Sequence, residues 1–295
     1  MLCGEIQSRS LAEVIQLSSQ VVFAPGDAAL TKDMKKLFYD LLRPVYKPIL
    51  KPLRRRLGRN YFGHPEMELP PPYEAIQLDV ERHLHRYLHV RPEDISQIVI
   101  VGAHEADEVE RMHRTYSRAR FLCFEPNPET HRRLIRSFEK SPHVTISGLA
   151  LSDAPGQARF YEMDMPGNGS LLEPDVESWS AFNNWNEKKV RSFEVTLSTL
   201  DREAEALAAI DLLWMDVQGA EGNILKGAAK TLPRTAAVFL EVALVRSPYK
   251  GALLFPQINA NLQSNGFTCM GLGMDAWNGT GNALFVKDLE KLVCK

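Results

Sequence analysis

The chain has 295 residues, of which 44% are hydrophobic and 24% are charged, and its formal net charge is −2 at pH 7. This is an ordinary globular composition. No apolar run approaches the ~20 residues that a membrane-spanning helix needs, and the N-terminus lacks the basic-then-apolar order of a signal peptide. We therefore expect a cytoplasmic protein.

Four scattered cysteines argue against a disulfide framework and against a metal held by cysteine, because no CxxC pair occurs. They are Cys3, Cys123, Cys269 and Cys294. Cys123 lies in an apolar run, where we expect a buried thiol. Scattered thiols of this kind indicate a reducing compartment.

The basic charge is concentrated near the N-terminus. Residues 31–60 contain ten Lys or Arg and two acids, a balance of +8, so the rest of the chain sums to −10. Apolar residues recur there at helical spacing, but Pro44, Pro48 and Pro52 would interrupt a straight helix. We expect residues 1–70 to form a basic helical extension with a Pro-rich linker, and residues 71–295 to form the main domain.

Two interpretations of this extension stay open. Apolar residues beside Lys and Arg are typical of a helix that lies on anionic lipid, peripheral to the membrane. The same pattern fits a segment that packs on the main domain or on a second subunit. The prolines favour packing, because they break the continuous amphipathic face. Nucleic-acid binding is disfavoured, since few aromatic residues interleave with the basic ones.

After Pro92 short apolar runs alternate with helical segments, a pattern that predicts a doubly wound, mostly parallel sheet. The predicted strands are 98–101, 120–124, 144–150, 212–215 and 237–242, with late strands near 267–271 and 283–286. The predicted helices are 105–118, 128–140, 221–231 and 255–265. An insertion at about 156–200 contains two probable edge strands, 158–162 and 191–197, and the aromatic tract WSAFNNW.

Polar and small residues follow the first three predicted strands, where such sheets bind ligands. In VGAHEADE, Gly102 and Ala103 let the backbone approach a ligand, and His104 lies in the same turn. Glu125, after the second strand, can accept two hydrogen bonds from a ribose diol or cap the next helix. Ser152 and Asp153, after the third strand, fit either an adenine contact or a hairpin turn.

Three acids are associated with the next two predicted strands. Asp216 ends the fourth strand and can orient an acceptor hydroxyl, act as a base or contact a cofactor. Glu221 opens the following helix, where catalysis and a first-turn role are equally good interpretations. Glu241 falls inside a strand that should be buried, and a buried carboxylate needs a partner or a function.

The sequence motifs at these positions resemble those of the FkbM family of S-adenosylmethionine-dependent methyltransferases. VGAHEADE, FEPNP, ALSDAPG, NGSLLEP and DVQGAE with ILKGA occur in the family's order, and the resemblance spans roughly Gln97–Lys287. It departs from the family at Ile100, where Asp is usual, at Ala106, where Gly is usual, and at Trp214, where Lys is frequent.

The resemblance implies a Rossmann-like class I methyltransferase fold, S-adenosyl-L-methionine as cofactor, and methylation of a hydroxyl on a glycan, lipid-linked or secondary-metabolite acceptor. The cofactor residues would be Gly102, Ala103, His104, Glu125, Ser152 and Asp153, and the catalytic residues Asp216, Glu221 and Glu241. The alternative is a non-catalytic member that binds a nucleotide-like ligand or a partner. No metal is expected, because His83, His85 and His89 alternate with charged residues as on a solvated helix.

Overall fold

The computed structural model describes residues 84–85, 90–104, 106–163, 167–175, 190–274 and 279–287. The chain divides into two units, residues 1–69 and 70–295, and every described residue belongs to the second. The predictions for the basic extension, the Pro-rich linker and the aromatic tract at 179–185 lie outside the described residues. The domain boundary near residue 70 therefore stays a prediction.

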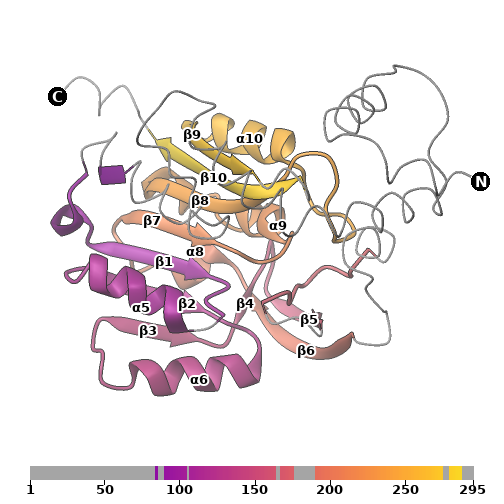
Figure 1. The fold of residues 1–295 in the computed structure, drawn as a ribbon, viewed down its shortest axis with the longest axis horizontal. Coiled ribbons are helices and arrows are strands. Elements are labelled where there is room, and N and C mark those ends of the chain that lie inside the picture. The colour runs from indigo at the N-terminus through magenta and orange to yellow at the C-terminus, as the bar shows by residue number, and fades with distance from the viewer. Residues whose placement is uncertain are drawn as a thin grey trace, which may run out of the picture. The chain divides into compact units, whose positions relative to one another are not determined.

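A seven-stranded sheet forms the centre of the domain, in the order β3-β2-β1-β7-β8-β10-β9 (Figure 1). The strands are β1 (Gln97–Val101), β2 (Arg120–Phe124), β3 (Val144–Ser147), β7 (Ile210–Met215), β8 (Thr235–Ala243), β9 (Phe267–Met274) and β10 (Thr280–Lys287). The first five of these are parallel, and β10 runs antiparallel to β8 and β9. The mostly parallel, doubly wound sheet is confirmed.

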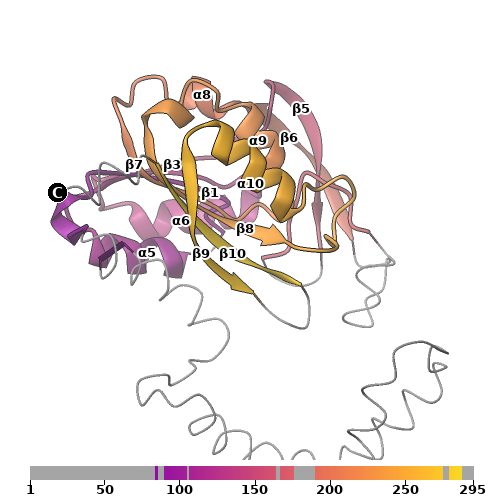
Figure 2. The ribbon, with the colours of Figure 1, turned by 90° about the horizontal axis from the view of Figure 1, so that it is seen from above.

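Helices cover both faces of this sheet, which explains why its central strands are apolar along their whole length. They are α5 (Ala106–Thr115), α6 (Pro128–Phe138), α8 (Leu200–Glu203), α9 (Glu221–Lys226) and α10 (Phe255–Ser264). Val109 of α5 and Leu134 of α6 belong to one core, whereas Ile224 of α9 and Leu262 of α10 belong to the other. Figure 2 shows α5 on one side of the sheet and α9 and α10 on the opposite side.

The prediction of a single strand over Val144–Ala150 was wrong. After Ser147 the chain leaves the large sheet, and a short strand, β4 (Ala150–Leu151), pairs with β6 (Arg191–Ser198). The Ser147 hydroxyl accepts a hydrogen bond from the Leu149 amide at 3.4 Å, so a side chain replaces a ladder partner at the break. Apolar residues continue through this turn, and their pattern therefore conceals the change of sheet.

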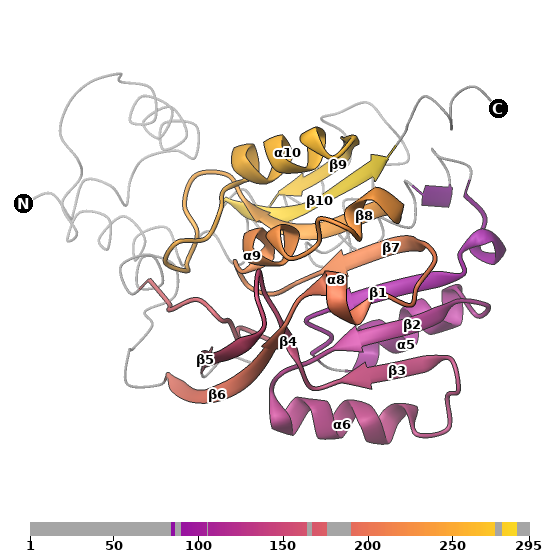
Figure 3. The same cartoon turned by 180° about the vertical axis from the view of Figure 1, so that it is seen from behind.

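The predicted strands of the insertion exist, but they do not extend the large sheet. β5 (Gly156–Glu162) pairs antiparallel with β6, and β6 pairs with β4, so the three form a sheet of their own. Figures 1 and 3 show this small sheet beyond the ends toward which β1 and β7 point.

The predicted helix 221–231 is shorter than expected and ends at Lys226. A Cβ at Gly227 would lie 2.1 Å from the Ser152 carbonyl oxygen, so the chain approaches the β4 segment closely there. The helix α8 was not predicted; its N-cap is Thr199, whose side chain accepts from the Arg202 amide. None of the helices in the described ranges is long and apolar enough to cross a membrane.

The strand order reverses between β1 and β7. The chain passes from β1 to β2 on one side and from β7 to β8 on the other, with α5 and α9 on opposite faces. The loops after β1 and β7 therefore diverge and leave a crevice at the carboxyl ends of the strands, where ligands bind in this class of fold.

Candidate active site

A cavity of about 520 Å³ lies at this crevice, within the size range of small-molecule sites. Its floor consists of residues that follow three parallel strands: Gly102 and His104 after β1, Glu125 and Asn127 after β2, and Asp216 and Val217 after β7. The turn from β3 to β4 contributes Leu149–Leu151, and the insertion contributes Gly167–Gly169. The cavity thus joins the large sheet to the small one.

Gly102 makes the first turn possible. Its φ is +81°, and a Cβ would lie 1.8 Å from the Asp216 carbonyl oxygen, so only glycine fits. The amides of Gly102 and Ala103 both donate to the Phe124 carbonyl at 3.0 Å. These amides hold the turn together, and the Ala103 side chain is buried away from the cavity. Of the predicted cofactor residues in this turn, Gly102 and His104 face the cavity.

Glu125 is fixed by the two turns beside it. Its Oε2 accepts from the His104 amide and its Oε1 from the Asn127 amide, both at 2.8 Å. Burial raises the pKa of this carboxyl to about 7, although the two amide hydrogen bonds act in the opposite direction. Each carboxylate oxygen can still accept a second hydrogen bond, which two neighbouring ligand hydroxyls would satisfy.

Asn127 connects Glu125 to the small sheet. Its Oδ1 caps α6 by accepting from the amides of Glu129 and Thr130, and Pro128 follows at the first helical position. Its side-chain nitrogen Nδ2 donates to the Glu162 carboxyl group of β5 at 2.8 Å, and Glu162 forms an ion pair with Arg191 of β6 at 3.1 Å. One wall of the cavity is therefore tied to the N-terminus of α6.

Asp216, Gln218 and Glu241 form a hydrogen-bonded cluster on the other side of the cavity. The Gln218 Nε2 donates to Asp216 Oδ1 at 2.7 Å and to Glu241 Oε2 at 2.9 Å. The Gln218 Oε1 accepts from the Tyr249 hydroxyl at 2.9 Å. The carboxyl groups of Asp216 and Glu241, which the sequence associates with two successive strands, are thus joined through the side-chain amide of Gln218.

The two carboxyl groups of this cluster have different surroundings. The Asp216 residue is exposed to the cavity, and desolvation by the surrounding protein raises its pKa, while the Gln218 hydrogen bond and His104 oppose that rise. Glu241 does not line the cavity; burial and the negative charges of Asp216 and Glu221 hold its pKa well above the usual range. Asp216 is therefore the acid of the pair that a ligand can reach.

Glu221 faces the turn before α9 rather than the cavity. It is buried, and its Oε1 accepts from the amides of Val217 at 3.1 Å and Gly219 at 3.4 Å. Burial raises its pKa to about 7, with these hydrogen bonds opposing the shift. The geometry favours the first-turn role that the sequence left open beside catalysis.

Ser152 and Asp153 do not line the cavity. The Ser152 amide donates to the Ser198 carbonyl, its hydroxyl donates to Asp153 at 3.2 Å, and Asp153 is exposed. This is the turn geometry that competed with the adenine interpretation. The apolar residues just before it, Leu149 to Leu151, are the part of this segment that reaches the cavity.

Neither Tyr249 nor Gln218 is among the site residues predicted from sequence. Tyr249 is 4% exposed and lies in the segment after β8, far from any motif. Gln218 has a φ of +55°, which is unusual for a residue other than glycine, and such backbone often marks functional turns. The position of Gln218 within the DVQGAE motif could have indicated a role in the site, whereas Tyr249 lies in no sequence motif that would have indicated one.

The departures from the family pattern lie away from the cavity. The Ile100 side chain is buried in the core on the α5 side, and Trp214 packs on Phe239 with ring centroids 4.0 Å apart. Neither of these residues nor Ala106 lines the cavity.

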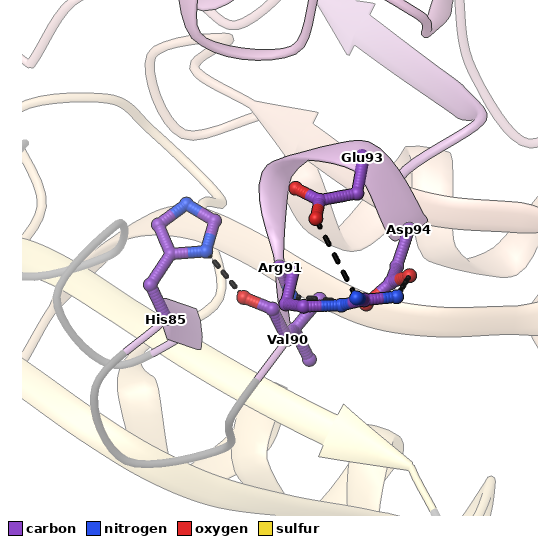
Figure 4. Close-up of polar contacts among 5 residues, drawn as sticks. All are labelled: His85, Val90, Arg91, Glu93 and Asp94. Carbon is purple, nitrogen blue, oxygen red and sulfur yellow. Dashed lines mark hydrogen bonds and ion pairs between the residues drawn. The ribbon is translucent and has the colours of Figure 1, made fainter.

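His85 is one of three histidines for which the sequence predicts a solvated helix face rather than a metal site; the other two, His83 and His89, lie outside the described residues. The His85 Nδ1 contacts the Val90 carbonyl, and its Nε2 lies 3.3 Å from the Tyr116 hydroxyl. Figure 4 shows the contact between His85 and the Val90 carbonyl beside the turn in which Arg91 pairs with Asp94. Within the described ranges, no three His, Cys, Asp or Glu side chains converge as metal ligands.

The fold and the cavity define the class of protein. A parallel sheet with reversal between β1 and β7, closed by the antiparallel pair β10–β9, is the arrangement of class I S-adenosylmethionine-dependent methyltransferases. The model of the methyltransferase FkbM domain matches residues 101–269, more than half of the chain. The chain belongs to the FkbM family of S-adenosylmethionine-dependent methyltransferases, and S-adenosylmethionine is its cofactor.

Two curated relatives are similar over part of their length. The 2-O-methyltransferase NoeI of Sinorhizobium fredii is 27% identical over 157 residues, which cover 49% of this chain and 62% of NoeI. Methyltransferase 1 of Beauveria bassiana is 30% identical over 147 residues, 45% of this chain and 59% of that protein. The chain thus matches about three fifths of each relative.

Among solved structures, the N-methyltransferase NodS of Bradyrhizobium japonicum, in complex with S-adenosyl-L-homocysteine, is 9% identical with a TM-score of 0.43. The match covers 75% of this chain and 90% of NodS.

The residues of the cavity fit the cofactor. Gly102 brings backbone close to the cavity, Glu125 has one free acceptor position on each oxygen that would suit two ribose hydroxyls, and Leu149–Leu151 form an apolar wall that would suit a flat base. Asp216 and His104 supply polar groups at the other end.

Proposed function

We propose that this protein transfers the methyl group of S-adenosylmethionine to a hydroxyl oxygen. The observation that carries the proposal is the pair of acids in one cavity, Glu125 and Asp216, at the ends of β2 and β7. Glu125 suits a diol, whereas Asp216 is the accessible acid on the opposite side. The printed activity of NoeI, a 2-O-methyltransferase, supports oxygen as the target.

The division of roles follows from this geometry. The cofactor, when bound, supplies a methyl group activated by a sulfonium sulfur. Glu125 would hold the ribose, and Gly102 would let the cofactor approach the backbone. Asp216 would orient the acceptor hydroxyl and accept its proton as the oxygen takes the methyl group, a role worth roughly 10²- to 10⁴-fold in rate.

The acceptor would be a small molecule or glycan with a free hydroxyl, or a lipid-linked or secondary-metabolite acceptor. Support comes from the polar residues of the insertion beside the cavity, among them Asn168. A cytoplasmic location fits the buried free thiol of Cys123, whose pKa burial raises to about 12. Contact of residues 31–60 with anionic lipid, or with a second copy of the chain, remains a prediction from sequence.

Calorimetric titration with S-adenosylhomocysteine, followed by methyl transfer to a panel of hydroxylated acceptors, tests the proposal. We expect micromolar binding that Glu125→Ala weakens most. Asp216→Asn should keep binding within a few fold while transfer falls at least 100-fold. Failure of the folded protein to bind the cofactor would overturn the proposal and favour the non-catalytic, partner-binding alternative. Binding with undiminished transfer by Asp216→Asn would remove Asp216 as proton acceptor.

A further inference from the structure

Gln218 is the residue on which the acid cluster converges. A primary amide has two N–H groups, and those of Gln218 are both used, one on Asp216 at 2.7 Å and one on Glu241 at 2.9 Å. Asp216 follows β7 and Glu241 lies in β8, so this single nitrogen joins carboxyl groups from two neighbouring strands.

The orientation of this amide is fixed from the opposite end. The Tyr249 hydroxyl donates to Gln218 Oε1 at 2.9 Å, and a flipped amide would turn that oxygen toward two carboxyl groups. The backbone is held as well, because the Ser170 hydroxyl donates to the Gln218 carbonyl at 2.8 Å. Tyr249 and Ser170 are 4% and 1% exposed, so both clamps are shielded from water.

The two carboxyl groups that share the amide are not equivalent. Asp216 opens into the cavity, with His104 across the first turn, whereas Glu241 lies behind it near Glu221 and Tyr249. Two close carboxylates do not both ionise readily, because each charge opposes the other. Burial raises the pKa of Asp216, and the Gln218 hydrogen bond and His104 oppose that rise, whereas burial and both neighbouring acids hold the pKa of Glu241 well above its usual range.

We propose that Gln218 is a positioning residue that keeps Asp216 as the ionised carboxylate facing the cavity and leaves the proton on Glu241 behind it. The inference deepens the proposed function, since an ionised Asp216 is what proton acceptance from a hydroxyl needs. It concerns the protein alone, so its test requires neither cofactor nor acceptor.

The test is a pH titration of the full chain, labelled with ¹³C at the side-chain carboxyl carbons of Asp and Glu, followed by NMR. Asp216→Asn and Glu241→Gln identify the two resonances. We expect Asp216 to be ionised and Glu241 protonated at pH 7. Gln218→Met, which keeps the length but removes the amide, should raise the Asp216 midpoint by one pH unit or more, and Tyr249→Phe should raise it less.

The Glu125 resonance is the internal control and should not move in either variant. If Gln218→Met fails to fold, Gln218→Glu replaces it, with a larger rise expected because a donor becomes a further acid. An unchanged Asp216 midpoint in the folded variant, or a protonated Asp216 beside an ionised Glu241 at pH 7, would overturn the inference. The proposed function is judged separately, by cofactor binding and methyl transfer.

Discussion

Glu125 shows how the surroundings of a single residue set its chemical properties. Any glutamate after a strand can accept hydrogen bonds, but here two backbone amides hold both oxygens in place and burial raises the pKa to about 7. The proposed ribose contact therefore depends on the protonation state of this carboxyl near pH 7, because the ionised form is the better acceptor for a diol.

The affinity for S-adenosylhomocysteine should consequently depend on pH. We expect the Kd to rise by up to tenfold per pH unit below about 7, because a proton on Glu125 must be released before both hydroxyls can donate to it. Calorimetric titrations between pH 5.5 and 8 measure this dependence.

Glu125→Gln should bind about 10- to 100-fold more weakly above pH 7 and lose that part of the pH dependence, since a hydrogen bond to a charged group contributes about 1.5–3 kcal/mol. Glu194→Gln, an exposed glutamate on β6, is the matched control and should behave as wild type. A wild-type Kd constant across this pH range would contradict the ribose role.

At the scale of elements, the cavity exists because close backbone contacts bring three turns together. The turn after β1 lies on the carbonyl of Asp216 after β7 and is hydrogen-bonded to Phe124 at the end of β2. The small sheet is tied to the N-terminus of α6 through Asn127 and Glu162. Disturbing one turn should therefore affect the whole site.

Gly102→Ala should destabilise the protein by several kcal/mol more than Gly251→Ala. Both glycines have nearly the same φ, +81° and +78°, but a Cβ at residue 102 would lie 1.8 Å from a backbone oxygen and one at residue 251 would meet nothing within 4 Å. Gly251→Ala should lower the free energy of unfolding by about 1 kcal/mol, because only the cost of placing an alanine at a positive φ applies there. Urea unfolding of the two variants compares them directly, and equal costs would show that the first turn can relax.

At the scale of the whole molecule, four raised carboxyl pKa values around one cavity make the fold depend on pH. Asp216, Glu221 and Glu241 lie on one side, and Glu125 lies on the other. A carboxyl whose pKa is raised by folding binds its proton more tightly in the folded state. Its stabilising contribution is complete at low pH and is lost as pH rises from the unfolded to the folded pKa.

Glu221→Gln isolates one of these contributions. The pKa of Glu221 rises from 4.5 to about 7 on folding, so ionisation should cost wild type on the order of 3 kcal/mol of stability between these pH values. Glutamine resembles the protonated acid and can still accept from the Val217 amide. We expect the variant to match wild type near pH 4.5 and to be more stable at pH 8, as measured by urea unfolding.

Glu203→Gln is a suitable comparison, because Glu203 lies on α8, away from the cavity, and accepts a hydrogen bond from the Ser198 hydroxyl at the end of β6. Its stability difference from wild type should not grow between pH 4.5 and pH 8 as that of Glu221→Gln does. Lower stability of Glu221→Gln at pH 8 would mean that the ionised form of Glu221 stabilises the turn.

Apart from α8 and the break between β3 and β4, the alternation of strands and helices could be predicted from sequence, as could the bounds of Arg120–Phe124 and the position of Glu125 and Asp216 at strand ends. Apolar runs and helical periodicity are local properties, and the carboxyl ends of parallel strands necessarily meet at one edge. The cofactor was predicted from the resemblance to the FkbM family, because the family's sequence motifs occur in this chain in the same order.

Only the tertiary structure decided which of the predicted residues meet. Leu149 to Leu151 reach the cavity while Ser152 and Asp153 do not, and Tyr249 reaches Gln218 from the segment after β8. The assignment of β4 to a second sheet was likewise hidden, because apolar residues continue across the break. The local pattern of apolar and polar residues indicates whether a segment is buried or forms a turn. Which residue it contacts depends on how segments distant in the sequence pack together, and the periodicity of a single sequence carries no information about that packing.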